Sequence, residues 1–183
     1  HIGTTISLIV YFRKDWKKIL KSLFNKKTSK RNLALIVIGT IPAIILGAIF
    51  EQTITNAFSD VIVASIFLIF NGLLLFFGEQ TKKRGNKSIE DLKGWQALVI
   101  GCFQSLALIP GFSRSGSSIT AGFWMGLSNE ESARFSMLLS TPMVAGAATL
   151  EIPKLIKNHV PGLLSLSLIG GIVAGLAAFL SIY

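Results

Sequence analysis

Long apolar runs without charged residues constrain this chain more than any other feature. Leu33–Phe50, Val61–Phe77 and Leu163–Tyr183 contain no Asp, Glu, Lys or Arg. About 20 such residues are enough to cross a bilayer as a helix. In lipid, backbone N–H and C=O groups pair only within helices or closed barrels, and barrel strands would alternate apolar and polar residues. These runs do not alternate, so they predict an all-α, polytopic membrane helix bundle.

The charged residues are few and unevenly placed. Only 15% of the chain is charged, against about 25% in soluble domains. Nine of the 18 basic residues fall in Arg13–Arg31, which we interpret as a basic loop, and Gly78–Gly94 is also basic, whereas Glu51–Asp60 has no Lys or Arg. This asymmetry predicts that the first two segments are cytoplasmic and the third external. The net charge of +9 therefore indicates membrane lipids as partners and no nucleic acid.

One polar stretch, Pro110–Ser118 (Pro-Gly-Phe-Ser-Arg-Ser-Gly-Ser-Ser), lies between apolar segments. An arginine at membrane depth is costly and is kept where it meets an anion or lines a wet cavity. Serine hydroxyls and the N–H groups at the start of a following helix favour the same partner. The stretch thus predicts an anion site centred on Arg114. The alternative is an ordinary loop with a solvated arginine, which the apolar flanks disfavour.

The segments around this stretch are too short to span a bilayer. Trp95–Ile109 is about 22 Å long as a helix, and the piece that ends at Phe123–Leu127 is also short. We therefore expect a re-entrant helical hairpin that enters from the cytoplasm and turns at Gly111–Gly116, with Gln104 facing its interior.

The second half of the chain predicts two further spans. Ser128 and Glu131 have the spacing of a capping box at the start of a helix. The next span, Phe135–Leu150, is expected to be broken by Pro142. Glu151–Gly162 reads as a polar link before the last span.

The sequence Gln104–Ser118 closely resembles the second signature motif of the undecaprenyl-diphosphate phosphatase family, the bacitracin-resistance membrane phosphatases. The opening His1-Ile-Gly-Thr-Thr, the run Gly39–Ala43 and the run Ala133–Ser136 are similar to other stretches of that family. The resemblance covers nearly the whole chain in order.

This resemblance implies an inverted-repeat fold with two re-entrant hairpins near mid-membrane. It implies hydrolysis of undecaprenyl diphosphate to the monophosphate and inorganic phosphate, at the outer side of the bacterial inner membrane. By motif match, Arg114 is the catalytic residue that binds the diphosphate. The matched substrate-binding residues are Ser113, Ser115, Gly116, Ser117, Ser118 and Gly111. Ser117-Ser118 stands where relatives often have Ala-Thr, which keeps the second hydroxyl.

The family's other motif, a glutamate pair with a Ser-Ser-Thr-Gly-His run, has no match in this sequence. We therefore interpret residues 1–183 as a single integral membrane domain that is a fragment, and we expect it to be inactive alone. The chain itself is expected to hold no metal and no cofactor. A divalent cation, Mg²⁺ or Ca²⁺, remains open for the full protein, as does a homodimer.

Two other function classes stay open from the residues alone. Broken helices whose N-termini face an anion are also typical of transporters, so a lipid flippase is the main alternative. A structural membrane subunit is the third, and it leaves Arg114 unexplained.

Overall fold

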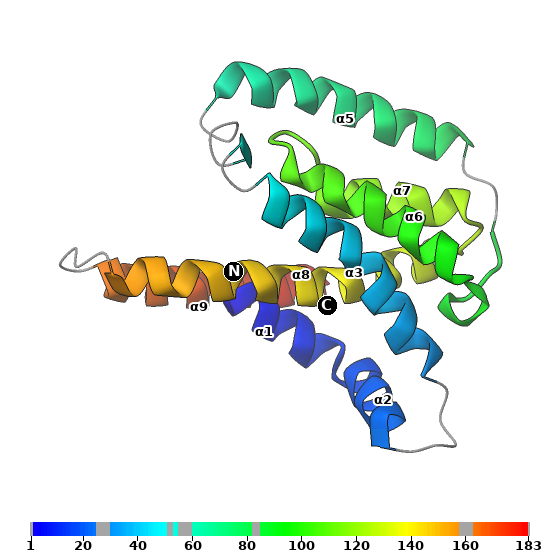
Figure 1. The fold of residues 1–183 in the computed structure, drawn as a ribbon, viewed down its shortest axis with the longest axis horizontal. Helices are drawn as coiled ribbons and strands as arrows, with labels where there is room; N and C mark the ends of the chain where they lie inside the picture. The colour runs from blue at the N-terminus through cyan, green and yellow to red at the C-terminus, as the bar shows by residue number, and fades with distance from the viewer. Residues whose placement is uncertain are drawn as a thin grey trace. The chain divides into compact units, whose positions relative to one another are not determined.

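The computed structural model of this protein describes residues 2–24, 30–50, 53–54, 60–81, 85–157 and 163–182. Every regular element longer than a single bridge in these ranges is helical, which confirms the all-α prediction (Figure 1). The helices are α1 (Ile2–Tyr11), α2 (Arg13–Phe24), α3 (Arg31–Ile49), α5 (Val61–Thr81), α6 (Gly94–Ser105), α7 (Arg114–Trp124), α8 (Asn129–Lys157) and α9 (Leu163–Ile182), with short 3₁₀ turns η1 (Ile89–Asp91) and η2 (Leu106–Leu108). Two compact units form, Ser29–Leu139 and His1–Thr28 with Ser140–Tyr183.

Helices α3 and α5 are long and apolar enough to cross a membrane. Most of α5 presents apolar side chains outward; Val61 is 78% and Ile69 67% exposed. Contiguous apolar surface of this kind is unfavourable in water and favourable against lipid tails. The exposed face of α5 therefore indicates a membrane protein rather than a soluble bundle. The inverted repeat stays a prediction.

The unit Ser29–Leu139 packs α3 against α6 and α5 against α7, with α6 and α7 side by side (Figure 1). Glycines let α3 and α6 approach closely. A Cβ atom on Gly101 would overlap the backbone carbonyl of Gly39, and one on Gly39 would meet the carbonyl oxygen of Ala97 at 3.1 Å. Small residues at such crossings are typical of helix pairs in membranes, where packing replaces the hydrophobic effect.

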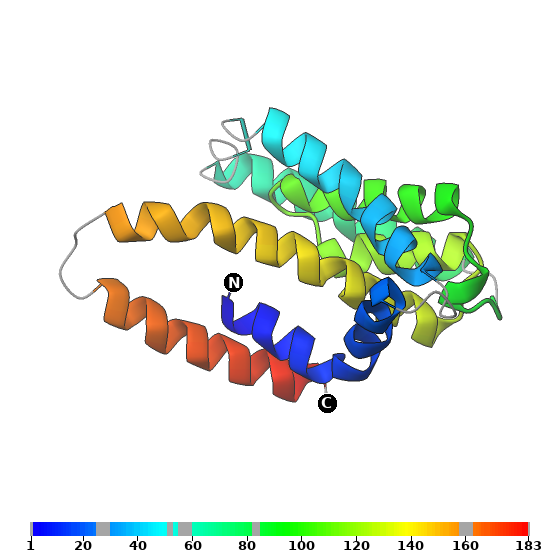
Figure 2. The ribbon, with the colours of Figure 1, turned by 60° about the horizontal axis from the view of Figure 1, so that its bottom comes forward.

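The other unit contains α1 and α9, which lie side by side (Figure 2). Gly3 of α1 faces Gly171 and Gly175 of α9, so both backbones come close. The hydroxyl of Ser7 donates a hydrogen bond of 2.6 Å to the carbonyl of Gly175. The same hydroxyl also lies 3.1 Å from the carbonyl of Gly3, so the contact between the helices includes a polar group that is satisfied on both sides.

The structure corrects three boundaries that the sequence suggested. Residues 13–24 form helix α2 rather than part of a loop. The number of basic residues predicts a loop, whereas their spacing places them on one side of a helix. Helix α8 runs through Pro142 without a break and continues to Lys157, since membrane helices tolerate proline. The predicted polar link therefore begins later than Glu151. Most of the predicted external segment Glu51–Asp60 lies outside the described residues.

Candidate functional site

The motif stretch forms the tip of a helical hairpin made by α6, η2 and α7. The two helices pack together, with Gln96 Nε2 donating to the carbonyl of Met125 at 3.2 Å and the rings of Phe103 and Trp124 5.4 Å apart. The predicted hairpin is therefore confirmed as a fold, and its position in a bilayer stays a prediction. Its second helix begins at Arg114, earlier than the sequence suggested.

Helix α7 begins here because Ser113 caps it. The Ser113 backbone is extended, with φ −82° and ψ 115°, and its hydroxyl oxygen accepts a hydrogen bond of 3.2 Å from the N–H of Gly116. A serine in this position satisfies one of the N–H groups that the first turn leaves without a helical partner. The first turn then points its remaining N–H groups and the positive end of the dipole at the tip. The sequence thus builds a helix start whose geometry suits an anion.

Arg114 occupies the first position of that helix. Its side chain is half-buried, and within the described ranges its guanidinium has no hydrogen-bond or ion-pair partner. The neighbouring Ser115 is half-buried too, and no described group accepts from or donates to its hydroxyl. A half-buried guanidinium without a carboxylate is stabilised by an external anion. Ser113, Arg114, Ser115 and Gly116 thus lie together on one helix turn that suits a phosphate.

Helix α5 holds the tip from behind, through a residue that sequence reasoning missed. Asn71 is 6% exposed, and its Oδ1 accepts a hydrogen bond of 3.0 Å from the N–H of Ser113. Gly111, one of the predicted site residues, has φ +95°, and a Cβ there would overlap the backbone of Ala64 and Leu68. Gly111 therefore shapes the turn and packs on α5. The available signal was Asn71 itself, the one amide within the apolar run Val61–Phe77.

The last two predicted site residues point into the protein instead of the tip. Ser118 is 1% exposed, and its Oγ lies 2.6 Å from Ser136 Oγ on α8 and 2.9 Å from the carbonyl of Arg114. Ser117 is fully buried, and its Oγ has no partner among the described residues. Their hydroxyls thus lie behind the turn that carries Arg114.

Gln104 of α6 shares this buried setting. It is 0% exposed, which agrees with the prediction that it faces the hairpin interior. Neither of its amide atoms has a hydrogen-bond partner in the part of the chain that the structure describes. A buried amide without a partner lowers the free energy of unfolding, so Gln104 destabilises the hairpin.

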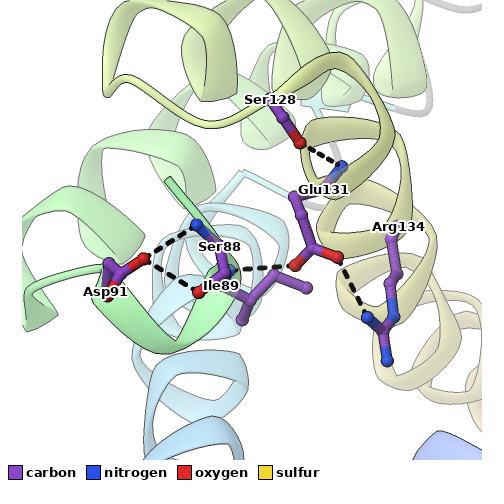
Figure 3. Close-up of polar contacts among 6 residues, drawn as sticks. All are labelled: Ser88, Ile89, Asp91, Ser128, Glu131 and Arg134. Atoms are coloured by element: carbon purple, nitrogen blue, oxygen red, sulfur yellow. Dashed lines mark hydrogen bonds and ion pairs between the residues drawn. The ribbon is translucent and has the colours of Figure 1, made fainter. Parts of the chain in front are cut away.

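The base of the hairpin is fastened by Glu131 at the start of α8 (Figure 3). Its N–H donates to Ser128 Oγ at 3.2 Å, which forms one half of the predicted capping box. The carboxylate does not complete the box. It accepts from the N–H of Ile89 at 2.9 Å and from Arg134 at 3.0 Å. Glu131 therefore joins the loop before α6 to the helix after α7.

A second contact in the same loop involves Asp91 (Figure 3). Its Oδ2 accepts from both the N–H and the hydroxyl of Ser88, each at 2.9 Å. These hydrogen bonds hold the pKa of the Asp91 carboxyl below its usual value, the backbone N–H having the larger effect. Lys87 also pairs with the turn after α7, through its N–H to the carbonyl of Gly126 at 3.2 Å. Hydrogen bonds thus join the loop before α6 to the turn after α7 at the base of the hairpin.

The donor set at the tip does not suit a metal ion. A guanidinium, hydroxyls and N–H groups bind anions, whereas Mg²⁺ and Ca²⁺ take carboxylate and carbonyl oxygens. No group of three or more His, Cys, Asp or Glu side chains that could hold a metal occurs in the described ranges. A divalent cation would need ligands other than these residues.

An apolar cavity of about 350 Å³ lies next to the tip. Helix α3, the start of α5 and the end of the first hairpin arm line it, and Phe67, Cys102, Leu106, Ile109 and Pro110 are among its residues. Ile109 and Pro110 directly precede the turn that leads to Arg114. An apolar space and a helix start that suits an anion therefore adjoin each other within one unit.

Comparison with known proteins places the chain among membrane proteins of one family. A family model described as bacitracin resistance protein BacA matches residues 1–183. Undecaprenyl-diphosphatase 2 of Burkholderia thailandensis is 39% identical, over 100% of this chain and 67% of its own length. The undecaprenyl-diphosphatases of Acidiphilium cryptum and Gluconacetobacter diazotrophicus are 38% and 40% identical, over 99% of this chain and 68% and 67% of their lengths. The chain thus spans about two thirds of each relative.

Proposed function

This chain belongs to the BacA family of bacitracin resistance proteins, and from that membership we propose that it hydrolyses undecaprenyl diphosphate to undecaprenyl phosphate and inorganic phosphate. The structural observation that carries the proposal is that a helix start suited to an anion and an apolar cavity lie next to each other at the hairpin tip. The half-buried Arg114 begins a helix capped by Ser113, and the apolar cavity ends at Pro110. A lipid diphosphate has a doubly anionic head and an apolar tail, so each part meets a matching surface.

The roles of the residues follow from their chemistry. In phosphoryl transfer, catalysis is mostly positioning and stabilisation of charge on the equatorial oxygens. Arg114 offers a planar fork that matches two phosphate oxygens at once. The N–H groups of the first turn of α7 add positive potential at the same place, and Ser115, on the same turn, carries a hydroxyl that can donate to a phosphate oxygen. Asn71 and Ser113 act by positioning this turn.

The group that activates the attacking water is not among these residues. A guanidinium stays protonated and does not serve as a general base, and no carboxylate or histidine forms an ion pair or hydrogen bond with Arg114 within the described ranges. A divalent cation, when one is bound by other residues, would neutralise further phosphate charge. What the described site contributes is binding, orientation and charge neutralisation.

The cellular setting is part of the proposal. The protein belongs in the plasma membrane of a bacterium, with the site open to the outer side, where it returns the lipid carrier to cell-wall synthesis. The charge asymmetry of the loops supports this orientation, since Gly78–Gly94 is basic. A lipid diphosphate as partner follows from the same site, and homodimer formation stays a prediction.

Phosphate release from undecaprenyl diphosphate tests the activity. The complete product of the gene that encodes this sequence is purified in detergent, and inorganic phosphate is measured over time. We expect turnover that Arg114→Ala lowers by at least about two orders of magnitude, whereas Arg13→Ala, an exposed arginine on α2, leaves it unchanged. A protein that releases no phosphate but moves the lipid across vesicle bilayers would instead be a transporter.

A further inference from the structure

Helix α2 carries a cationic face that the proposed activity does not use. Its five basic residues are all exposed: Arg13, Lys14, Lys17, Lys18 and Lys21. At about 100° per residue they fall within an arc of about 140° on one side of the helix. Trp16 and Ile19 lie on the opposite side, and Ile19 is 5% exposed. The helix is therefore amphipathic, with its apolar side packed and its basic side turned outward.

The position of α2 in the chain places it at a membrane boundary. It begins two residues after the apolar helix α1 ends at Tyr11, with only Phe12 between them (Figure 2). The apolar run thus ends where the cations begin, so α2 starts at the level of the headgroups. Leu20, next to the basic face, is 53% exposed. An exposed leucine beside lysines is typical of a helix that lies in the interface.

We propose that α2 lies along the membrane surface and binds the headgroups of anionic phospholipids through its basic face. The opposing acidic residue in this helix is Asp15 alone, so internal ion pairs do not neutralise five cations. Each lysine near an anionic lipid surface raises binding by roughly fivefold. The site differs from the one at Arg114, which lies in the other compact unit, and its failure would leave the proposed hydrolase activity untouched.

Trp16 makes the proposal measurable, because it is half-buried within α2 itself. Residues 1–183 hold three tryptophans, so Trp95→Phe and Trp124→Phe, with Phe at any tryptophan outside this range, leave Trp16 as the sole emitter. This background is reconstituted in phosphatidylcholine vesicles with a fixed share of brominated phosphatidylglycerol or brominated phosphatidylcholine. Bromine quenches only nearby tryptophans, so the ratio of the two quenching efficiencies reports which headgroup gathers at α2. We expect brominated phosphatidylglycerol to quench at least about twice as strongly in low salt.

Three triple variants, added salt and added inorganic phosphate test the proposal. Lys17→Gln, Lys18→Gln and Lys21→Gln together should lower the ratio to about one, while Arg at the same positions should preserve it. The matched control replaces three exposed lysines outside α2, Lys30, Lys87 and Lys93, with Gln and should leave the ratio unchanged. Salt of about 0.5 M should lower the ratio in the unsubstituted background, because exposed charges are screened, which keeps the test valid if a triple variant misfolds.

Two results overturn the proposal. One is equal quenching by both lipids in low salt, which would mean that α2 is an ordinary solvated helix. The other is loss of the phosphatidylglycerol preference on adding 20 mM inorganic phosphate at constant ionic strength. That result would indicate a site for free phosphate instead of a lipid surface.

Discussion

The guanidinium of Arg114 is available to an external anion because no carboxylate among the described residues pairs with it. The first turn of α7, capped by Ser113 and anchored through Asn71, orients it while leaving its guanidinium without a partner among the described residues. An internal ion pair would have lowered its attraction for phosphate. The residue is therefore positioned by its backbone, and its charge stays available to an external anion, which the proposed function assigns to the substrate.

Replacement of Arg114 by lysine is the sharpest test of this role. Lysine keeps the charge but loses the two-point contact with phosphate. We expect kcat and kcat/KM for phosphate release to fall together, by roughly 3 to 4 kcal/mol or two to three orders of magnitude. The yield of folded protein in detergent should be unchanged, because the side chain is half-buried at a helix start rather than packed in a core. Near-normal kcat in a well-folded variant would remove Arg114 from the mechanism.

Gln104 tests the opposite kind of residue, one that costs stability. Its amide is completely buried without a partner in the described part of the chain. Methionine has a similar length and no amide to desolvate. We therefore expect Gln104→Met to leave the melting temperature in detergent unchanged or higher. A fall of several degrees would show that the amide has a partner in the folded protein.

At the scale of elements, close backbone contacts hold the hairpin in place. The α3–α6 crossing depends on glycine at two positions, and α5 supports the turn at Gly111. Glu131 and the loop before α6 fix the other end. Close backbone approaches and hydrogen bonds from backbone N–H groups to side chains position the tip, together with the contact between the rings of Phe67 and Phe112.

Gly101→Ala probes the α3–α6 crossing. The added methyl group would overlap the backbone of Gly39, and overpacking of this kind costs roughly 1 to 3 kcal/mol. We expect the melting temperature to fall by roughly 2 to 10 °C. Gly72→Ala in α5 is the matched control, since no atom lies within 4 Å of the new Cβ. If both variants melt at the wild-type temperature, the helices do not cross as closely as described.

At the scale of the whole molecule, the apolar surface of α5 determines which medium surrounds the protein. If α5 crosses the membrane with the basic segment Gly78–Gly94 inside, Asp60 lies outside and Lys93 inside. On a Cys102→Ser background, an impermeant maleimide should label Asp60→Cys in intact spheroplasts. It should label Lys93→Cys only after permeabilisation. The reverse pattern would invert the orientation and place the site on the cytoplasmic side.

Much of this protein follows from its sequence alone. The apolar runs at Leu33–Phe50 and Val61–Phe77 predict helices because lipid leaves the backbone no other way to pair. The Pro-Gly-Phe-Ser-Arg-Ser-Gly motif indicates the family and the anion site, because its residue types are local chemistry. The cap by Ser113 is also local, since it depends on groups three residues apart.

Tertiary structure alone decided what lies across the helices. Asn71 is 42 residues from Ser113 in sequence, so no local pattern pairs them. The burial of Ser117 and Ser118 depends on the neighbouring helices, and the diversion of Glu131 from its capping box depends on Ile89, 42 residues away. The apolar cavity beside Pro110 likewise needs three segments brought together. Period and spacing describe one helix at a time, whereas these features depend on how the helices pack, which is set by contacts between distant residues.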